Sequence, residues 1–170
     1  MISDRRRLAG RIQVGLPPGE AFRLFTPRGE EDWAHSWHPR FPVPAADDTE
    51  PGTVFETHAH GQRATWLVTS REPGKRISYA RVITGEQAGT VTVTISASGG
   101  RTEAEVVYDL TALTSAASQE LRGCIGTHEV EIHHSPFGSD PTNDCNSMGS
   151  WGCASQSLEY VTLASPFTPR

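Results

Sequence analysis

Five short segments between residues 53 and 111 have the residue pattern of β-strands and follow one another with short turns between them. They are residues 53–60, 63–70, 76–83, 90–97 and 103–111, and glycines mark most of the turns. In the fourth segment Thr alternates with Val and Ile, as expected for a strand with one buried and one solvated face. The spacing therefore predicts a meander of short antiparallel strands.

The residues before this meander predict one more strand and a helix. Residues 11–16 alternate between polar and apolar side chains, which is typical of a strand. Pro17-Pro18-Gly19-Glu20 then begins a short helix, with Ala21, Phe22, Leu24 and Phe25 on its apolar face. A second helix is predicted to begin at Ser115–Leu121, with serine as the cap. A strand, a helix and a meander together indicate an α+β fold.

Length and charge exclude several classes of protein. A chain of 170 residues predicts one domain, and its net charge of −5 disfavours nucleic acid or a membrane surface as partner. No apolar run is long enough to span a membrane and no secretory signal is recognisable, so we expect a cytoplasmic protein. Three cysteines, an odd number, do not indicate a disulfide framework.

Composition changes abruptly near residue 122. Residues 1–122 contain fourteen of the fifteen Lys and Arg residues, whereas residues 123–170 contain only Arg170 together with all three cysteines. We therefore divide the chain into a folded domain at 1–122 and an atypical tail at 123–170. The tail is either an irregular segment with its own role or the product of a shifted reading frame, a hypothesis that the coding DNA around codon 122 tests.

A second feature is the aromatic stretch from Leu24 to Pro39, with Trp33, His35, Trp37 and His38. Together with Pro51-Gly52-Thr53-Val54-Phe55-Glu56-Thr57-His58, Trp66 and Tyr108-Asp109-Leu110-Thr111-Ala112-Leu113, it resembles the SRPBCC superfamily (START, polyketide-cyclase-like and Bet v 1-type proteins). The resemblance covers about residues 8–121. It implies a helix-grip fold, in which a curved sheet and helices enclose a cavity for hydrophobic small molecules, lipids included.

The resemblance also implies a long C-terminal helix across the concave face of the sheet. Such a helix needs apolar residues at i, i+3, i+4 and i+7 over several turns, but glycines and prolines interrupt residues 123–141. We therefore expect this helix to be absent or disrupted, which would leave Ile77, Tyr79, Val106 and Tyr108 partly uncovered. Poor solubility, or a homodimer that buries the concave face, would follow.

The positions that match the resembled superfamily predict a set of ligand-binding residues. Tyr79 and Arg81 lie two apart on one strand, so they share a face and could orient an acid or a phenol. The alternative is that the aromatic residues simply fill the core. The predicted set is Trp33, Trp37, Phe41, Phe55, Trp66, Tyr79, Arg81 and Tyr108.

No metal site, cofactor or catalytic constellation is predicted. His58 and His60 share a strand face with Glu56, but His-x-His pairs are common by chance, and an exposed outer face is the favoured interpretation. No carboxylate is placed to orient His35 or His38. The tail spacing of Cys124, His128, His133, His134, Cys145 and Cys153 matches no familiar zinc module.

These observations predict a protein that binds a small hydrophobic or amphipathic ligand. Two alternatives from other classes stay open. One is a polyketide cyclase or dehydrase-like enzyme, in which tyrosine, histidine or arginine moves protons. The other is an interaction module like the chaperone regulators of the superfamily, and fold analogy does not choose among the three.

Overall fold

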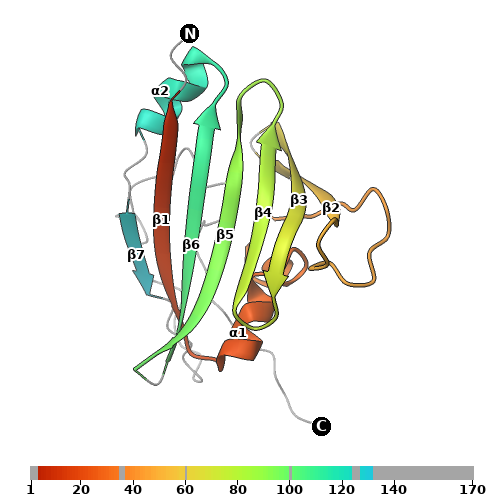
Figure 1. Cartoon of the computed structure of the whole chain (residues 1–170), viewed down its shortest axis with the longest axis vertical. Helices are drawn as coiled ribbons and strands as arrows, with labels where there is room; N and C mark the ends of the chain where they lie inside the picture. Colours follow the sequence, from red (N-terminus) through yellow and green to blue (C-terminus); the bar gives the residue numbers. More distant parts are fainter. Residues whose placement is uncertain (1–3, 35–36, 60, 100, 124–126, 132–170) are drawn as a thin grey trace, which may run out of the picture.

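The structure, a computed structural model, describes residues 4–34, 37–59, 61–99, 101–123 and 127–131. Its main element is a curved seven-stranded sheet in the order β2-β3-β4-β5-β6-β1-β7 (Figure 1). The strands are β1 (Arg5–Val14), β2 (Val54–Ala59), β3 (Gln62–Glu72), β4 (Arg76–Ile83), β5 (Gln87–Ser98), β6 (Arg101–Ala112) and β7 (Thr127–Glu131). The helices are α1 (Pro18–Leu24), the 3-10 helix η1 (Gly29–Asp32) and α2 (Ser115–Gly123).

The meander from β2 to β6 is confirmed, with each strand antiparallel to the next. β1 closes the sheet by pairing with β6, from Arg5 opposite Thr111 to Val14 opposite Thr102. It begins at Arg5, six residues before the predicted strand, and the Arg5 guanidinium forms two hydrogen bonds of 2.7 Å with Asp109 on β6. β7 pairs with the other edge of β1 in parallel. The α+β helix-grip architecture is therefore as predicted, apart from this one parallel pairing.

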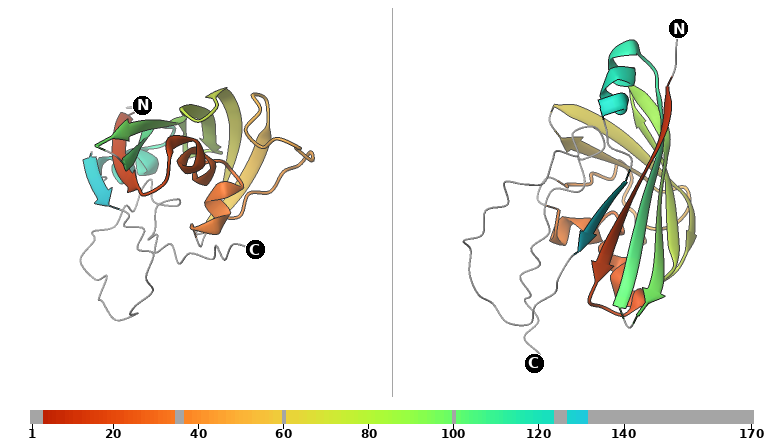
Figure 2. Two further views of the ribbon diagram at one scale, coloured as in Figure 1. Left: turned by 90° about the horizontal axis from the view of Figure 1, so that it is seen from below. Right: turned by 90° about the vertical axis from the view of Figure 1, so that its left-hand side faces the viewer.

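Two features bend the sheet and reverse the chain. Gly74 and Gly85 lie in the β3–β4 and β4–β5 turns with φ of 73° and 77°, a left-handed conformation that glycine adopts without steric cost. The β3–β4 register shifts between Val68 and Ser70, which is a bulge that increases local twist. The sheet can therefore curve around α1, as Figure 2 shows.

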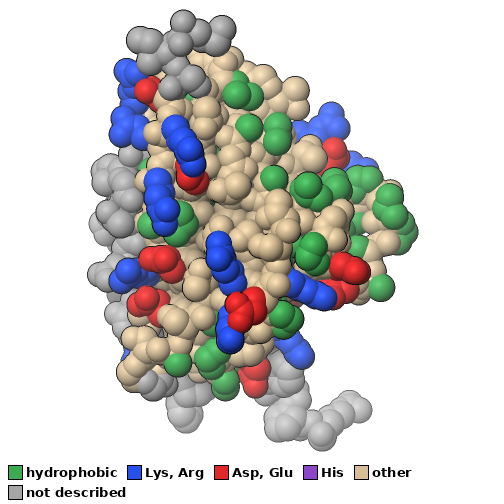
Figure 3. Space-filling view, in the orientation of Figure 1, with side chains coloured by type: hydrophobic (Ala, Val, Ile, Leu, Met, Phe, Trp, Pro, Cys, Tyr) green, Lys and Arg blue, Asp and Glu red, His purple; other side chains and the backbone are tan. Residues whose placement is uncertain are grey.

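The two faces of the sheet differ as the alternation predicts. The inner, concave face is the core, with Ile77 and Leu110 fully buried and Ile12 and Val93 nearly so. The outer face, seen in Figure 3, bears separated charged side chains, and apolar side chains gather toward β2 and the loop before it. The exposed large apolar residues in this region are Val43, Val54, Leu67 and Val82.

The concave face is covered, contrary to the expectation of an open face. Ile77, Tyr79, Val106 and Tyr108 are all buried. α1 and η1 lie on this side of the sheet (Figure 2), and Trp33 and Trp37 from the segment that follows them line one cavity together with Tyr79 and Tyr108. The reasoning from sequence was wrong because it assigned the cover to a C-terminal helix alone.

α2 packs at the opposite end of the sheet from α1 (Figure 1), where it buries Ala117 and Leu121. It is nine residues long, and no helix follows it within the described residues. The long C-terminal helix of the resembled superfamily is therefore not formed by this part of the chain. None of the described helices combines the length and the apolar character that crossing a bilayer requires.

Candidate functional site

The Trp-rich segment is fixed to the end of α1 by its own indole groups. The Trp33 indole N–H donates a hydrogen bond of 2.6 Å to the carbonyl oxygen of Leu24, and the Trp37 indole N–H donates one of 2.7 Å to Pro27. Gly29 allows the tight approach that this path needs, because a Cβ there would lie 1.7 Å from the carbonyl oxygen of Arg23. Both indole rings are consequently held over the concave face.

Four aromatic rings meet where this segment contacts the sheet. Phe55 on β2 and Trp66 on β3 are register partners, and their rings stack with centroids 5.7 Å apart. Trp37 packs edge-on against both rings, at 6.1 and 5.4 Å, and Tyr79 does so at 5.9 and 6.0 Å. The Trp66 indole N–H donates to the Thr57 hydroxyl at 3.0 Å, so the polar atom of this buried ring has a partner.

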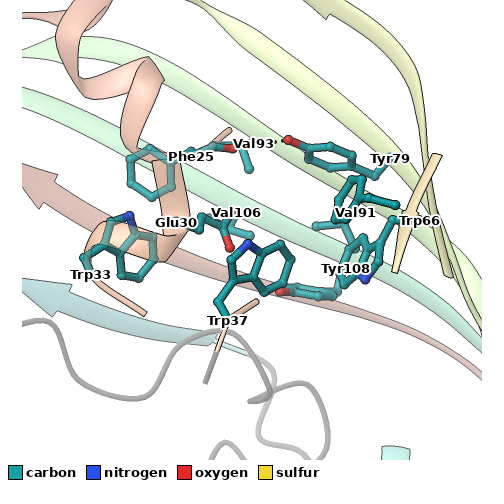
Figure 4. A pocket seen from close by; sticks show the side chains of 11 residues that line it. Phe25, Glu30, Trp33, Trp37, Trp66, Tyr79, Val91, Val93, Val106 and Tyr108 are labelled. Carbon is teal, nitrogen blue, oxygen red and sulfur yellow. Dashed lines mark hydrogen bonds between the residues drawn. The ribbon is translucent and has the colours of Figure 1, made fainter. Parts of the chain in front are cut away.

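A small cavity lies between these rings and the middle of the sheet (Figure 4). Only about 20 Å³ is open to the centre of a water molecule, which is room for about one water. The rings therefore fill most of the space. The lining residues are Phe25, Glu30, Trp33, Trp37, Phe55, Trp66, Tyr79, Val91, Val93, Val106 and Tyr108.

Glu30 is the acidic residue in this otherwise aromatic and aliphatic lining. It comes from η1, and its side chain points between Trp33 and Trp37 (Figure 4). Among the described residues no group donates a hydrogen bond to its carboxylate, although its backbone bonds to Thr26, Trp33 and Ala34. Burial raises the pKa of the Glu30 carboxyl well above its ordinary value of 4.5, which favours the protonated acid.

Two tyrosines add hydroxyl groups to the same lining. The Tyr79 hydroxyl donates a hydrogen bond of 3.2 Å to the carbonyl oxygen of Phe25. Burial is the main cause that raises the pKa of Tyr79 well above 10, and the nearby charge of Glu30 is the second. This tyrosine therefore stays a neutral hydrogen-bond donor. Tyr108, from β6, lies across β5 from Tyr79, since both are register partners of Val91.

The structure brings most of the predicted site residues together. Trp33, Trp37, Phe55, Trp66, Tyr79 and Tyr108 line the one cavity. Phe41 lies behind Phe55, with ring centroids 5.8 Å apart, under the guanidinium of Arg28. Arg81 lies beyond Trp66, with its guanidinium carbon 5.4 Å from the centre of that ring.

The predicted ligand-binding set did not include Phe25, Glu30, Val91, Val93 and Val106, although Phe25 and Val106 were placed on apolar faces from the sequence. The valines could have been found from alternation, because they share strand faces with Tyr108 and the buried Ile95. Glu30 was hidden in the acidic run Glu30-Glu31-Asp32, which has the pattern of a solvated turn. The one available signal was its spacing, three residues before Trp33, which places both on one face of a 3-10 helix.

The histidine positions do not converge on this site. His58 and His38 are exposed, and the Glu56 carboxylate lies 3.6 Å from the guanidinium of Arg63. His35, His60, Cys124, His133, His134, Cys145 and Cys153 lie outside the described residues, as does the side chain of His128. Within the described part of the chain, no three His, Cys, Asp or Glu side chains form a group that could hold a metal ion.

Comparisons with known proteins support the fold. No family model matches the sequence, and no curated protein matches it. An uncharacterized protein from Rhizobium leguminosarum has a similar structure, with 16% identity, a TM-score of 0.54 and coverage of 71% of this chain and 86% of that one. Protein MLL2253 from Mesorhizobium loti is similar too, with 20% identity, a TM-score of 0.54 and coverage of 69% and 85%.

DynU16, a protein from the dynemicin biosynthetic locus, matches with 18% identity and a TM-score of 0.50 over 71% of this chain. The match spans 42% of DynU16. These three likenesses support the α+β helix-grip fold that the sequence predicts. At these identities the likeness shows the fold alone.

Proposed function

We propose that the chain binds a small hydrophobic or amphipathic molecule between the concave face of the sheet and the Trp-rich segment. The observation that carries the proposal is the Glu30 carboxyl among aromatic rings. Glu30 is half-buried, and among the described residues no group donates a hydrogen bond to its carboxylate. Removing a polar group from water without such a partner costs free energy, so this arrangement does not serve stability. Ligand pockets typically combine apolar walls with a few such polar groups, which orient the ligand.

Binding requires movement, because the cavity has room for about one water. Most of the lining side chains are fixed in the sheet, whereas Trp33 and Trp37 come from the covering segment. Each of these two indoles donates one hydrogen bond to a backbone carbonyl. A ligand would therefore enter by displacing one or both rings, and tryptophan fluorescence should report its arrival.

Titration with Nile red, an uncharged hydrophobic dye, tests this proposal. We expect saturable binding at one dye per chain, with quenching of tryptophan fluorescence. Val106→Phe should abolish it, because Val106 lines the cavity and the larger ring would fill the remaining space. Val107→Phe is the matched control, since the side chain of the next residue points to the outer face. Equal binding by both variants, or no binding by the unmodified chain, would refute the proposal.

A polyketide cyclase-like enzyme is the second candidate, and Glu30 is the observation that favours it. A carboxyl group whose pKa is raised by burial can act as a general acid near neutral pH. In this role Glu30 would donate its proton to a carbonyl oxygen of a poly-β-keto chain, with the Tyr79 and Tyr108 hydroxyls beside it. Glu30→Gln, which keeps the size of the side chain but removes the acidic proton, should then abolish turnover of such a substrate. Unchanged turnover would exclude Glu30 as the acid.

A further inference from the structure

Arg81 is a charged side chain in the core of the molecule. It lies on β4 on the same face as Tyr79, and it is only 3% exposed. Its register partners are Trp66 on β3 and Gly89 on β5. Gly89 cannot be replaced by a larger residue without backbone movement, because a Cβ there would lie 2.0 Å from the carbonyl oxygen of Asp109. The position directly opposite Arg81 on β5 therefore has no side chain beside the guanidinium.

The contacts of Arg81 leave its charge uncompensated. One guanidinium nitrogen donates a hydrogen bond of 3.1 Å to the side-chain oxygen of Gln87, and the group also lies over the ring of Trp66. Among the described residues no carboxylate lies within 4.0 Å of it. The charge of Glu86 acts on Arg81 without contact, and the Glu86 carboxylate accepts a hydrogen bond of 2.5 Å from Gln62 instead.

Two exposed arginines of this chain differ from Arg81 in this respect. Arg5 and Arg122 each contact a carboxylate, at 2.7 and 2.5 Å. Burial lowers the pKa of Arg81, yet a guanidinium stays protonated at any pH the folded chain tolerates. A buried charge without an opposite charge costs several kcal/mol, so a purely structural role would favour an apolar side chain.

The guanidinium lies beside the cavity rather than apart from it. Trp66 separates the two on one side, and Tyr108, a lining residue, interacts electrostatically with Arg81. Glu30, by contrast, lies at the side of the cavity formed by Phe25 and Trp33 (Figure 4). Glu30 and Arg81, neither of which contacts an oppositely charged group among the described residues, thus lie on different sides of the apolar space.

We propose that Arg81 binds a carboxylate of the ligand, so that the ligand class is an amphipathic acid with its apolar body among the aromatic rings. This inference rests on the function proposed above. A planar guanidinium holds a carboxylate through two parallel hydrogen bonds, and Gln87 occupies only one of its five N–H groups. The binding energy would include the relief of the unpaired charge.

Competition between two matched aromatic compounds tests the inference. At pH 7.5, 2-naphthoate is an anion and 2-naphthamide is its neutral counterpart of nearly the same shape. Both are titrated against the complex of the unmodified chain with Nile red. We expect 2-naphthoate to bind at least about tenfold more tightly, because a hydrogen bond to a charged group contributes more than one to a neutral group.

Three variants identify the residue responsible. Arg81→Met removes the charge but keeps an unbranched side chain, and it should reduce the preference for 2-naphthoate to about one. Arg81→Lys keeps the charge and should retain part of the preference. Arg63→Met, which removes an exposed arginine from the neighbouring β3, should leave it unchanged. Arg81→Met should also unfold at a higher urea concentration, as expected when an unpaired buried charge is removed.

Each other result contradicts the inference. If Nile red binds but the unmodified chain does not prefer 2-naphthoate, Arg81 is no carboxylate site and the general binding function stands. A preference that persists in Arg81→Met, with a lower urea midpoint, would make Arg81 a structural residue. If Nile red itself does not bind, the proposed function fails and the inference fails with it. If Arg81→Met does not fold, the relative affinities for 2-naphthoate and 2-naphthamide, measured in the unmodified chain and in Arg81→Lys, still test the inference.

Discussion

Truncation of Trp66 should be among the most destabilising single changes in this chain. Trp66 is 3% exposed, its ring stacks on Phe55, and Trp37 and Tyr79 pack against its faces and edges. A buried tryptophan removes about 200 Å² from water, which at about 25 cal/mol per Å² is worth about 5 kcal/mol. An alanine side chain retains a small part of this burial free energy, and measured losses of stability for such truncations are about 3–5 kcal/mol. We therefore expect Trp66→Ala to lose about 4 kcal/mol.

Urea unfolding followed by circular dichroism measures this loss. With a slope of about 2 kcal/mol per molar urea, the midpoint should fall by about 2 M. His58→Ala is the control, because His58 is exposed on the neighbouring strand and its truncation should change stability by less than about 0.5 kcal/mol. Trp66→Phe should lie between the two, since it keeps a ring against Phe55 but loses the bond to Thr57. Equal midpoints for Trp66→Ala and His58→Ala would show that Trp66 is not in the core.

Two further predictions concern Glu30 and Gly89. The pKa of Glu30 is raised in the folded state, so above about pH 4.5 the folded state binds more protons than the unfolded state. The free energy of unfolding should therefore fall as the pH rises, by at most about 1.4 kcal/mol per pH unit. Glu30→Gln should remove this slope in urea midpoints measured from pH 4.5 to 8. A slope that persists in the variant would show that the pKa of Glu30 does not cause it. Asp47, with a pKa of about 2, acts only below this pH window. Gly89→Ala should cost about 1–3 kcal/mol or more, because its Cβ would meet the backbone of Asp109. Gly19→Ala is the control, because an added Cβ there meets nothing within 4 Å, and it should change stability by no more than about 1 kcal/mol. Calorimetry measures both variants. Equal effects would contradict the close approach of β5 and β6.

The strands could be predicted because each has one wet face. Along β6, residues from Thr102 to Ala112 alternate between buried and half-buried positions, and this period of two is visible in the sequence. The predicted ends of the strands were less accurate, since backbone pairing with a neighbour extends a strand beyond its apolar part. β5 begins at Gln87, whose side chain is buried beside Arg81, whereas the apolar alternation begins only at Thr90.

The cover of the sheet could not be predicted in the same way. Trp33 and Trp37 were recognisable as buried residues, but their positions depend on hydrogen bonds to the carbonyls of Leu24 and Pro27. Backbone carbonyls leave no trace in the side-chain pattern. Glu30 was missed for a related reason, because a charged residue in an acidic run is normally solvated. Arg81 was placed on the correct face, but its lack of an acidic partner required the three-dimensional arrangement.

The most direct test of ligand binding in this cavity uses the indole N–H resonances in a ¹⁵N-labelled sample. Trp33, Trp37 and Trp66 each donate one indole hydrogen bond, to Leu24, Pro27 and Thr57, and all three rings line the cavity. Their resonances can be assigned with Trp→Phe variants. If the cavity binds an amphipathic acid, titration with 2-naphthoate should shift all three resonances along one saturation curve. Unchanged positions of all three at millimolar 2-naphthoate, in a sample that remains folded, would contradict the proposed function of this chain.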